Sequence, residues 1–221
     1  MWKLYDDLYI GIPSGIRIDE CKIGRYWTAV RANGCTGIAK TLEMPEDPEQ
    51  FAASFKNGYL RDTANHMKWE NLALAQVGVA AMNAWYNTSG RADMLKGLSS
   101  PVEFPGKIAT VGNAAAENGF PLPMSPEFDA KAYASLRDFD AVVIDSEALI
   151  TRALPGLLDI AGESGNVILS GCSLPCTALF FAFGMPVREL RGSYIDSTGA
   201  GSGIDADSEV PGSLRAYFVY R

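Results

Sequence analysis

The sequence predicts a two-part α/β protein, in which an α+β N-terminal part precedes a parallel β-sheet. An Asn33-Gly34 pair, typical of a two-residue hairpin turn, separates two segments rich in β-branched and aromatic residues. In the second half, short runs of valine and isoleucine alternate with helix-start patterns, as they do in βαβ units. Between these halves, residues 87–106 lose their periodicity and collect glycine, serine and proline.

The N-terminal part is expected to begin with a three-stranded antiparallel meander. Its strands are predicted at residues 16–23, 26–32 and 35–41. Asn33-Gly34 would supply the turn between the second strand and the third. The alternation of the first strand slips near Glu20, which indicates a β-bulge.

Two helices are expected after the meander. Asp47 precedes a proline and has a glutamine three positions later, so it predicts a helix start. That helix should end at Asn57-Gly58, where the glycine would adopt the left-handed conformation. A second start at Asp62 leads into a helix over residues 66–86, which is apolar on all sides and therefore buried on most of its surface. Its polar Asn83 then needs hydrogen-bond partners.

The C-terminal part is expected to fold around parallel strands joined by helices. We predict an N-terminal domain at residues 1–90, a linker at 91–105 and a C-terminal domain at 106–221. The strands are predicted at residues 107–111, 139–144, 166–169, 187–190 and 216–220. The helices are predicted to begin at Ser125-Pro126-Glu127, to cover residues 153–161, and to run from Thr177 to a stop at Gly184.

Composition and charge exclude several classes of protein. Hydrophobic residues make up 48% and charged residues 20%, as in ordinary globular domains, so a disordered chain is not expected. The net charge of −7 opposes binding to nucleic acid or to an anionic membrane surface, since both require a basic footprint. No run approaches the roughly 18 apolar residues of a membrane span, and the first residues lack the apolar segment of a signal peptide. We therefore expect a cytoplasmic protein without membrane insertion.

Candidate ligand-binding residues follow three of the predicted strands. Ligands of open parallel sheets bind beyond the carboxyl ends of the strands, where small and polar residues let backbone N–H groups approach them. Such residues follow each of three strands here, although the same residue types also cap ordinary turns. The predicted ligand-binding positions at these ends are Gly112, Asn113, Asp145, Ser146, Gly171 and Ser173.

Two cysteines near the third strand end are candidate metal ligands. Cys172 and Cys176 are four residues apart, a spacing that would place them on one side of a helix, although Pro175 intervenes. Two thiolates would leave a tetrahedral ion short of ligands, and Asp145 is the oxygen donor we expect to contribute. The alternative is that both cysteines are small packing residues. His66 is the only histidine, which removes histidine-rich metal sites and most catalytic triads.

Several segments resemble a family of prokaryotic proteins of unknown function described as heavy-metal chelation proteins. The segment at residues 74–84, LAQVGVAAMNA, resembles a family motif, as do IGRYWTAV at 23–30 and GIAKT at 37–41. In the second half, residues 140–144 and 171–175 resemble the family's strand and its Gly-Pro-Ser-Thr-Pro loop. The resemblance covers nearly the whole chain.

The resemblance implies a domain similar to the N-terminal domain of enolase, joined to a Rossmann-like C-terminal domain, with a site in the cleft between them. Asn83 and the loops at 112, 145 and 171 would then line that cleft. The chain departs from the family pattern at Asp145-Ser146, where Thr-Gly is usual, at Thr151, where asparagine is usual, and at Cys172, where proline is usual. Residues after Gly112 also differ, because the family prefers aromatic and proline residues there.

Three functions remain open on the sequence. The first is binding or chelation of a divalent or heavy-metal ion, or of a metal-bearing small molecule, in the interdomain cleft. The second is a transferase or lyase that uses a nucleotide-like ligand such as S-adenosylmethionine. In that case Asp145 would contact a hydroxyl group, and Gly171 and Ser173 would offer backbone donors. The third is an oligomeric scaffold, a homo-oligomer without an active site.

Overall fold

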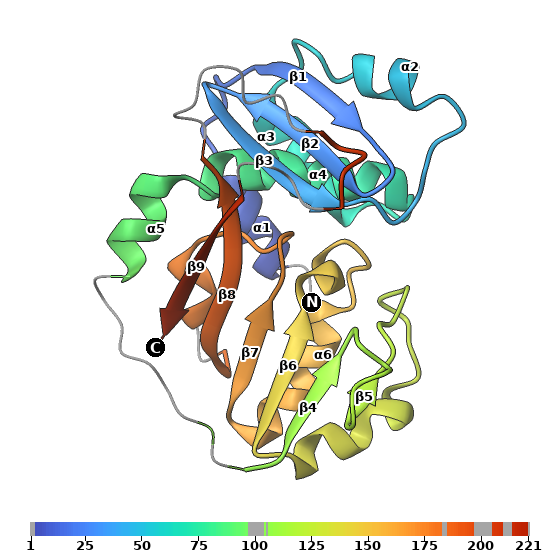
Figure 1. The fold of residues 1–221 in the computed structure, drawn as a ribbon, viewed down its shortest axis with the longest axis vertical. Helices are drawn as coiled ribbons and strands as arrows, with labels where there is room; N and C mark the ends of the chain where they lie inside the picture. The colour runs from blue at the N-terminus through green and yellow to red at the C-terminus, as the bar shows by residue number, and fades with distance from the viewer. Residues whose placement is uncertain are drawn as a thin grey trace.

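The computed structural model describes residues 3–96, 104, 106–182, 185–196, 205–209 and 214–220. The chain forms two separate sheets, a three-stranded sheet in the order β1-β2-β3 and a six-stranded sheet in the order β5-β4-β6-β7-β8-β9. Figure 1 shows the smaller sheet and its helices above the larger sheet. The predicted fold class is therefore confirmed.

The smaller sheet is the predicted antiparallel meander. It consists of β1 (Ile18–Ile23), β2 (Trp27–Ala32) and β3 (Cys35–Lys40). Asn33 and Gly34 both have positive φ, 52° and 74°, as a type I′ hairpin turn requires. The pairing of β1 with β2 shifts register between Ile18 and Glu20, which confirms the predicted bulge.

The N-terminal half also contains helices. They are α1 (Lys3–Ile10), α2 (Pro48–Ala53), α3 (Leu60–Ala64), the 3-10 helix η1 (Asn65–Lys68), α4 (Leu72–Tyr86) and α5 (Ser89–Lys96). Of these, α4 packs against β2 and β3, and α2 packs against β1. The Asp47 side chain caps α2 by accepting the N–H of Gln50, as predicted. The helix α1 was not predicted, and α5 occupies the start of the expected linker.

Two expectations for these helices were wrong. Asn57, with φ 66°, takes the left-handed position that we had assigned to Gly58. The single helix expected over residues 66–86 is divided, because the chain breaks after η1 and Asn71 caps a new helix through its bond from the Leu74 N–H. The break brings the η1 backbone onto α4, where a Cβ on Gly78 would lie 2.2 Å from the Met67 nitrogen.

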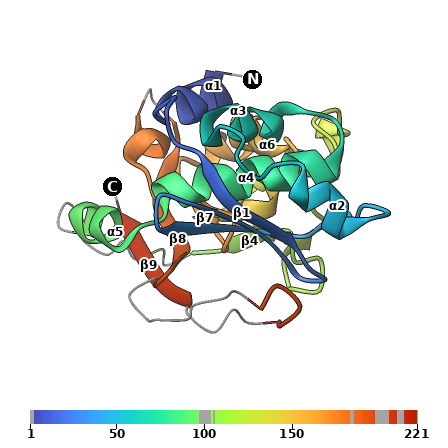
Figure 2. The same ribbon diagram turned by 90° about the horizontal axis from the view of Figure 1, so that it is seen from above.

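The larger sheet contains β4 (Ile108–Val111), β5 (Gly119–Phe120), β6 (Ala141–Asp145), β7 (Val167–Ser170), β8 (Val187–Ile195) and β9 (Leu214–Tyr220). Adjacent strands from β5 to β8 pair in parallel, and β9 pairs antiparallel with β8. The intervening helices are η2 (Ala130–Asp138), η3 (Ser146–Leu149), α6 (Leu154–Ala161), η4 (Gly162–Ser164) and η5 (Ala178–Phe181). The views from the front and from above place α6 behind the sheet (Figures 1 and 2).

Some local details of this half differ from the expectation. The helix expected at Ser125 begins instead at Ala130 as a 3-10 helix, because Asp129 accepts the N–H of Lys131 and so supplies the cap. The short strand β5 was not predicted. Thr177 caps η5 as expected, but the helix already ends at Phe181, because Ala182 has an extended backbone, and so it stops before the predicted end at Gly184. Residues 183 and 184 lie outside the described residues.

The two halves share a hydrophobic core and direct hydrogen bonds. Buried residues of α1, α4, β6 and β7 belong to one continuous apolar cluster. The Tyr5 hydroxyl of α1 donates a 3.1 Å hydrogen bond to the carbonyl of Leu149 in the C-terminal half. The carboxyl ends of the parallel strands point toward the meander (Figure 1), so the edge where ligands of such sheets bind faces the N-terminal half. No helix in the described ranges has the length and apolar composition of a membrane span.

Candidate functional site

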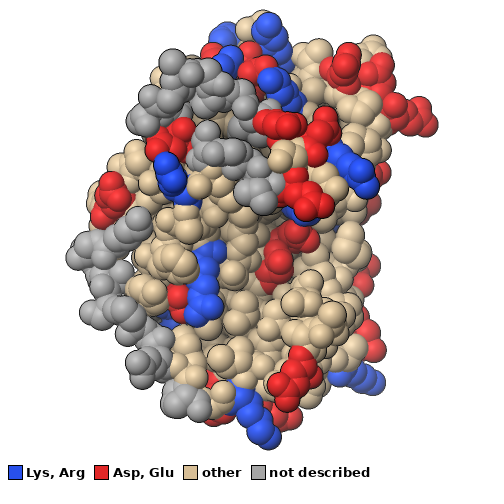
Figure 3. Space-filling model, in the orientation of Figure 1, with Lys and Arg blue, Asp and Glu red and all other residues tan. Residues whose placement is uncertain are grey.

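Three strand ends meet at the edge of the larger sheet that faces the meander. Val111 of β4 is paired with Ile144 of β6, and Asp145 of β6 with Ser170 of β7. The turns that follow these strands are therefore neighbours, as the parallel arrangement predicts. The space-filling view shows a hollow between the two halves on this side of the molecule, with acidic side chains at its centre (Figure 3).

Two glycines allow the outer turns to pack closely against the turn after β6. Gly112 and Gly171 have φ values of 107° and 133°, which favour glycine. A Cβ on Gly112 would lie 2.5 Å from the Cβ of Asp145, and one on Gly171 would lie 2.1 Å from the Oγ of Ser146. Asp145 and Ser146 thus lie between two turns, and each turn can approach them this closely only because it has a glycine at the point of contact.

A chain of hydrogen bonds connects the turn after β6 to the meander. The Oδ1 of Asp145 accepts the Glu147 N–H at 2.9 Å and the Ser146 hydroxyl at 3.4 Å. The Ser146 Oγ in turn accepts the Ser173 N–H at 3.2 Å. The Oγ of Ser173 accepts the backbone N–H of Lys40 at 2.9 Å. Ser173 therefore fixes the end of β3 against the strand ends of the larger sheet.

Lys40 brings a positive charge to this edge. Its ammonium group lies 5.0 Å from the ring centroid of Trp27 and 5.7 Å from that of Tyr26, within cation–π range. The same charge lowers the pKa of both Asp145 and Glu147, although burial outweighs it. Lys40 was not among the predicted site residues. It was noted only as part of the segment at 37–41 that resembles the family motif.

The acidic groups at the site are held toward their neutral forms. Burial, followed by the charge of Asp145, raises the pKa of Glu147 from 4.5 to about 7. Burial also raises the pKa of Asp145, against hydrogen bonds from Glu147 and Ser146 and the charge of Lys40. The Cys172 thiol has a raised pKa, chiefly because it is buried, and the two carboxylates raise it further. A cation placed here would favour the ionised form of each group.

Cys172 and Cys176 have different surroundings. Cys172 is half-buried beside the small apolar cluster that includes Trp27, and its Sγ lies 3.8 Å from the Ser193 Oγ. Cys176 is 1% exposed, and its backbone N–H is bonded to Asn87. Across the described ranges, no three His, Cys, Asp or Glu side chains come together as a group that could hold a metal ion. Cys172, Cys176 and Asp145 thus do not form a complete metal site by themselves.

Asn83 and Asn113 are two further residues that were predicted to bind a ligand. Asn83 is fully buried between α4 and β3, where its Nδ2 donates a 2.8 Å hydrogen bond to the carbonyl of Ile38. Its burial and this bond confirm two expectations, while its Oδ1 has no hydrogen-bond partner in the described part of the chain. Asn113 is exposed at the turn beyond β4. Thr151, at a position where the chain departs from the family pattern, is buried with its Oγ1 unpaired in the described ranges.

Asn87 is a residue that sequence reasoning missed. It directly follows α4 and is 3% exposed. Its Nδ2 donates to the carbonyl oxygens of Leu174 and Ser193 at 2.8 and 3.0 Å, and its Oδ1 accepts the Cys176 N–H at 2.6 Å. One side chain of the N-terminal half therefore fixes the loop after β7 and the end of β8.

A segment between β8 and β9 lies against the meander next to the hollow. We call residues 205–209 the strap. The carbonyl of Ala206 accepts the N–H groups of Tyr26 and Trp27, and the Trp27 indole donates a 3.0 Å bond to the carbonyl of Ser208. Gly24 is required beside the strap, because a Cβ there would lie 2.6 Å from Ala206. The strap thus fixes the position of Trp27 through hydrogen bonds. The ammonium group of Lys40 lies over the ring of the same tryptophan.

Comparisons with known proteins agree with this architecture. Two family profiles, both described as "Putative heavy-metal chelation", match residues 5–86 and 115–197. A structure of a DUF364-family protein of unknown function from Desulfitobacterium hafniense is similar over 100% of this chain and 98% of its own, with 23% identity and a TM-score of 0.78. Another, from Pyrococcus horikoshii, is similar over 99% and 98%, with 15% identity and a TM-score of 0.65. These two likenesses establish the fold, and no curated protein matches the chain.

Proposed function

Since the chain belongs to the family described as heavy-metal chelation proteins, we propose that it binds a metal ion already held by a small molecule. The site would be the hollow between the two halves. Asp145 and Glu147 would be the carboxylate donors, with the Cys172 thiol beside them. The observation that carries this proposal is the position of these two partly buried carboxyl groups, directly after β6 at the sheet edge that faces the meander.

An incomplete donor set favours a metal complex over a bare ion. Structural zinc sites usually have four protein ligands, and catalytic sites have three. The described residues provide no group of three such donors, so further ligands have to arrive with the metal. Gly112 and Gly171 would hold the two outer turns close to Asp145 because they carry no side chain. The predicted positions Ser146 and Ser173 would support the carboxylates through their hydrogen bonds.

The nucleotide-binding alternative has less support. That hypothesis needed free backbone donors after β7. The Gly171 N–H donates instead to the carbonyl of Arg191 at 2.8 Å, and the Ser173 N–H donates to Ser146. The Gly112 N–H is likewise bonded to the carbonyl of Phe120. A phosphate group would have to break these bonds before it could use the same donors.

Metal titration of the purified, chelator-treated protein tests the proposal. The probes are cobalt(II) alone and the cobalt(II)–nitrilotriacetate complex, in which part of the coordination sphere stays open. We expect the complex to bind, and the Asp145→Asn and Glu147→Gln variants each to weaken it by about tenfold or more, ~1.4 kcal/mol. Glu127→Gln, which changes an exposed glutamate outside the proposed donor set, is the matched control and should bind like the parent.

Proton release gives a second measurement of the same event. Because Glu147 is partly protonated near neutral pH, metal binding should release protons, and more of them below about pH 7 than above it. Glu147→Gln should reduce this release. Unchanged affinity and unchanged proton release in the Asp145→Asn, Glu147→Gln double variant would remove both carboxylates from the site and refute the proposal.

A further inference from the structure

The strand β1 forms a free edge of the meander. The sheet order places it outermost, with β2 as its neighbour on one side. The Gly24 N–H bonds to the carbonyl of Trp27. Lys22, two residues before Gly24, is paired with Ala29, two residues after Trp27. Because alternate residues of an antiparallel pair face the partner, the peptide groups of Cys21 and Ile23 must point away from β2.

The first part of this edge is covered, and the second part is open. The Ile18 N–H and carbonyl bond to Gly58 and Asn57, both at 2.9 Å. After the bulge the strand leaves that segment. In the described ranges, no backbone or side-chain group bonds to the outward N–H and C=O groups of Cys21 and Ile23. Unpaired peptide groups on a strand edge are a template for another strand.

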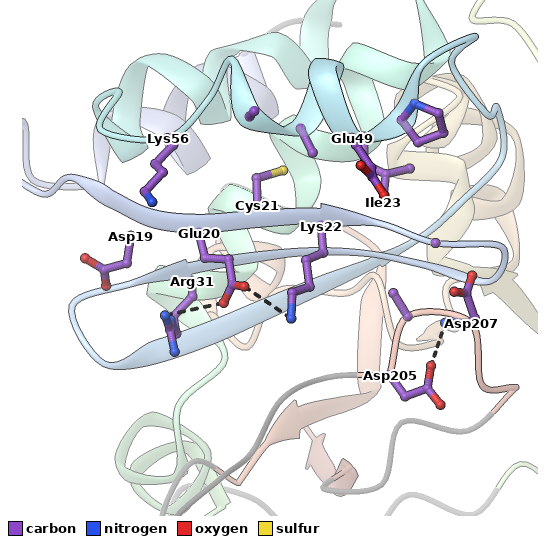
Figure 4. Close-up of a pocket in the computed structure, with 15 residues that line it drawn as sticks. Asp19, Glu20, Cys21, Lys22, Ile23, Arg31, Glu49, Lys56, Asp205 and Asp207 are labelled. Carbon is purple, nitrogen blue, oxygen red and sulfur yellow. Dashed lines mark hydrogen bonds and ion pairs between the residues drawn. The ribbon is translucent and has the colours of Figure 1, made fainter.

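A groove lies along the open part of the edge. It has a volume of about 600 Å³ and is lined by β1, α2 and the strap. We call it the β1 groove. Figure 4 shows the Cys21 and Ile23 side chains pointing toward α2, while Glu20 and Lys22 point to the opposite face of the sheet. Its α2 side is mainly apolar, because Pro48, Ala52 and Ala53 face the two β1 side chains there.

The charges around the groove are predominantly negative. Glu20 forms ion pairs with Lys22 at 3.2 Å and with Arg31 at 3.3 Å, so these three charges are largely satisfied among themselves. Of the remaining lining residues, Asp19, Glu49, Asp205 and Asp207 are acidic and none has an ion pair within the described chain, whereas Lys56 is basic. The groove therefore complements a positively charged occupant.

We propose that the β1 groove binds an extended peptide segment with alternating apolar and basic side chains, which adds to β1 as a fourth strand. A residue opposite Cys21 or Ile23 would point toward α2, where the wall is apolar. The residues between would point to the face that carries Asp205 and Asp207. Main-chain hydrogen bonds would give affinity, and the alternating walls would give specificity, as in other cases of strand addition.

A single strand fits this groove better than the sheet of a second copy. The edge is flanked by α2 on one side and by the strap on the other (Figure 4), which limits the width of what can approach. The charged Glu20 and Lys22 side chains on the strand also oppose the direct pairing of two sheets. The occupant is therefore a peptide rather than another folded edge.

The test uses the full chain and three labelled synthetic peptides. The first alternates lysine and valine over six residues, the second replaces every lysine with glutamate, and the third replaces the central valine of the first with proline. Binding is followed by fluorescence anisotropy, and the amide exchange of Cys21 and Ile23 by NMR. We expect the lysine–valine peptide to bind and to protect both amides, and the other two to bind at least about tenfold more weakly.

Variants of the chain locate the site. Ala53→Trp places a large ring in the groove from an exposed position and should weaken binding of the lysine–valine peptide by about tenfold. Ala132→Trp, at an exposed position of η2, is the matched control. Asp205→Lys combined with Asp207→Lys, on the face that the basic side chains would meet, should reverse the preference toward the glutamate peptide. Equal binding to Ala53→Trp, absence of binding, or unprotected amides would overturn the proposal. If the Cys21 and Ile23 amides became protected as the protein concentration rose, without any peptide, the edge would bind a second copy of the chain. That result would also overturn the proposal.

Discussion

The Oδ1 of Asn87 accepts a 2.6 Å hydrogen bond from the backbone N–H of Cys176, across the contact between the two halves of the chain. The same amide group also donates to two carbonyl oxygens, so that three backbone groups of the C-terminal half depend on one side chain. All of these groups belong to buried residues, so the Asn87 amide replaces the water to which they would otherwise bond.

Replacing Asn87 by alanine should therefore destabilise the protein by about 1–3 kcal/mol, the cost of leaving buried polar groups unpaired. Urea unfolding measures this change. Asn87→Asp keeps the acceptor for Cys176 and loses the two donated bonds, so it should also be destabilising. Asn113→Ala, at an exposed turn, serves as the control and should lie within about 0.5 kcal/mol of the parent. If Asn87→Ala and Asn113→Ala unfold at the same urea concentration, the amide does not join the halves.

The parts of the fold that sequence reasoning predicted are those that depend on local patterns. The Asn33-Gly34 turn requires two residues of positive φ, and this pair supplies them without tertiary help. The division between η1 and α4 has one local signal, the helix cap at Asn71, which was not used in the prediction. The packing of the Met67 backbone against Gly78 that accompanies this division is a tertiary contact, which no local pattern records.

In the candidate site, too, local patterns predicted one part, whereas another part depends on contacts between residues far apart in the sequence. The turns at Gly112, Asp145 and Gly171 were predicted because parallel strands bring their carboxyl ends to one edge. Lys40 and Asn87 were missed because their partners, Ser173 and Cys176, are 133 and 89 residues away in the sequence. Such contacts arise from the docking of one half on the other, which composition and periodicity do not encode. The division at residues 91–105 stays a prediction, since most of residues 97–105 lie outside the described ranges.

Gly171→Ala should disturb the site more than the backbone conformation alone would explain. The new Cβ would lie 2.1 Å from the Ser146 Oγ, so the hydroxyl that accepts the Ser173 N–H would have to move. We expect a loss of about 2 kcal/mol or more in stability, from the positive φ and the overlap together. Gly165→Ala separates the two effects, because Gly165 has φ 78° with nothing within 4 Å of its Cβ position. That control should cost about 1 kcal/mol, and an equal loss in both variants would mean that the contact with Ser146 is unimportant.

Gly24→Ala should loosen the strap from the meander. The added methyl group would overlap the Ala206 backbone, whose carbonyl accepts the N–H groups of Tyr26 and Trp27. We expect about 1–3 kcal/mol of destabilisation, together with a shift in the NMR signal of the Trp27 indole N–H, which is bonded to Ser208. Gly15→Ala meets nothing within 4 Å and should change neither quantity. An unshifted indole signal in Gly24→Ala would show that the strap tolerates a side chain at this position.

The raised pKa of Glu147 should make the stability of the protein depend on pH. The folded state holds a proton on this group up to about pH 7, whereas the unfolded chain releases it near the ordinary value of 4.5. Folding is therefore favoured by this group below about pH 4.5, and the contribution is lost as the pH rises through about 7.

Glu147→Gln removes the titrating group, so the parent should lose stability relative to this variant over that interval, as measured by urea unfolding at a series of pH values. Glu127→Gln should follow the parent at every pH, because its carboxyl is exposed. A constant difference between the parent and Glu147→Gln would mean that folding does not shift the pKa of Glu147. The proton release expected on metal binding would then have to come from Asp145 or Cys172.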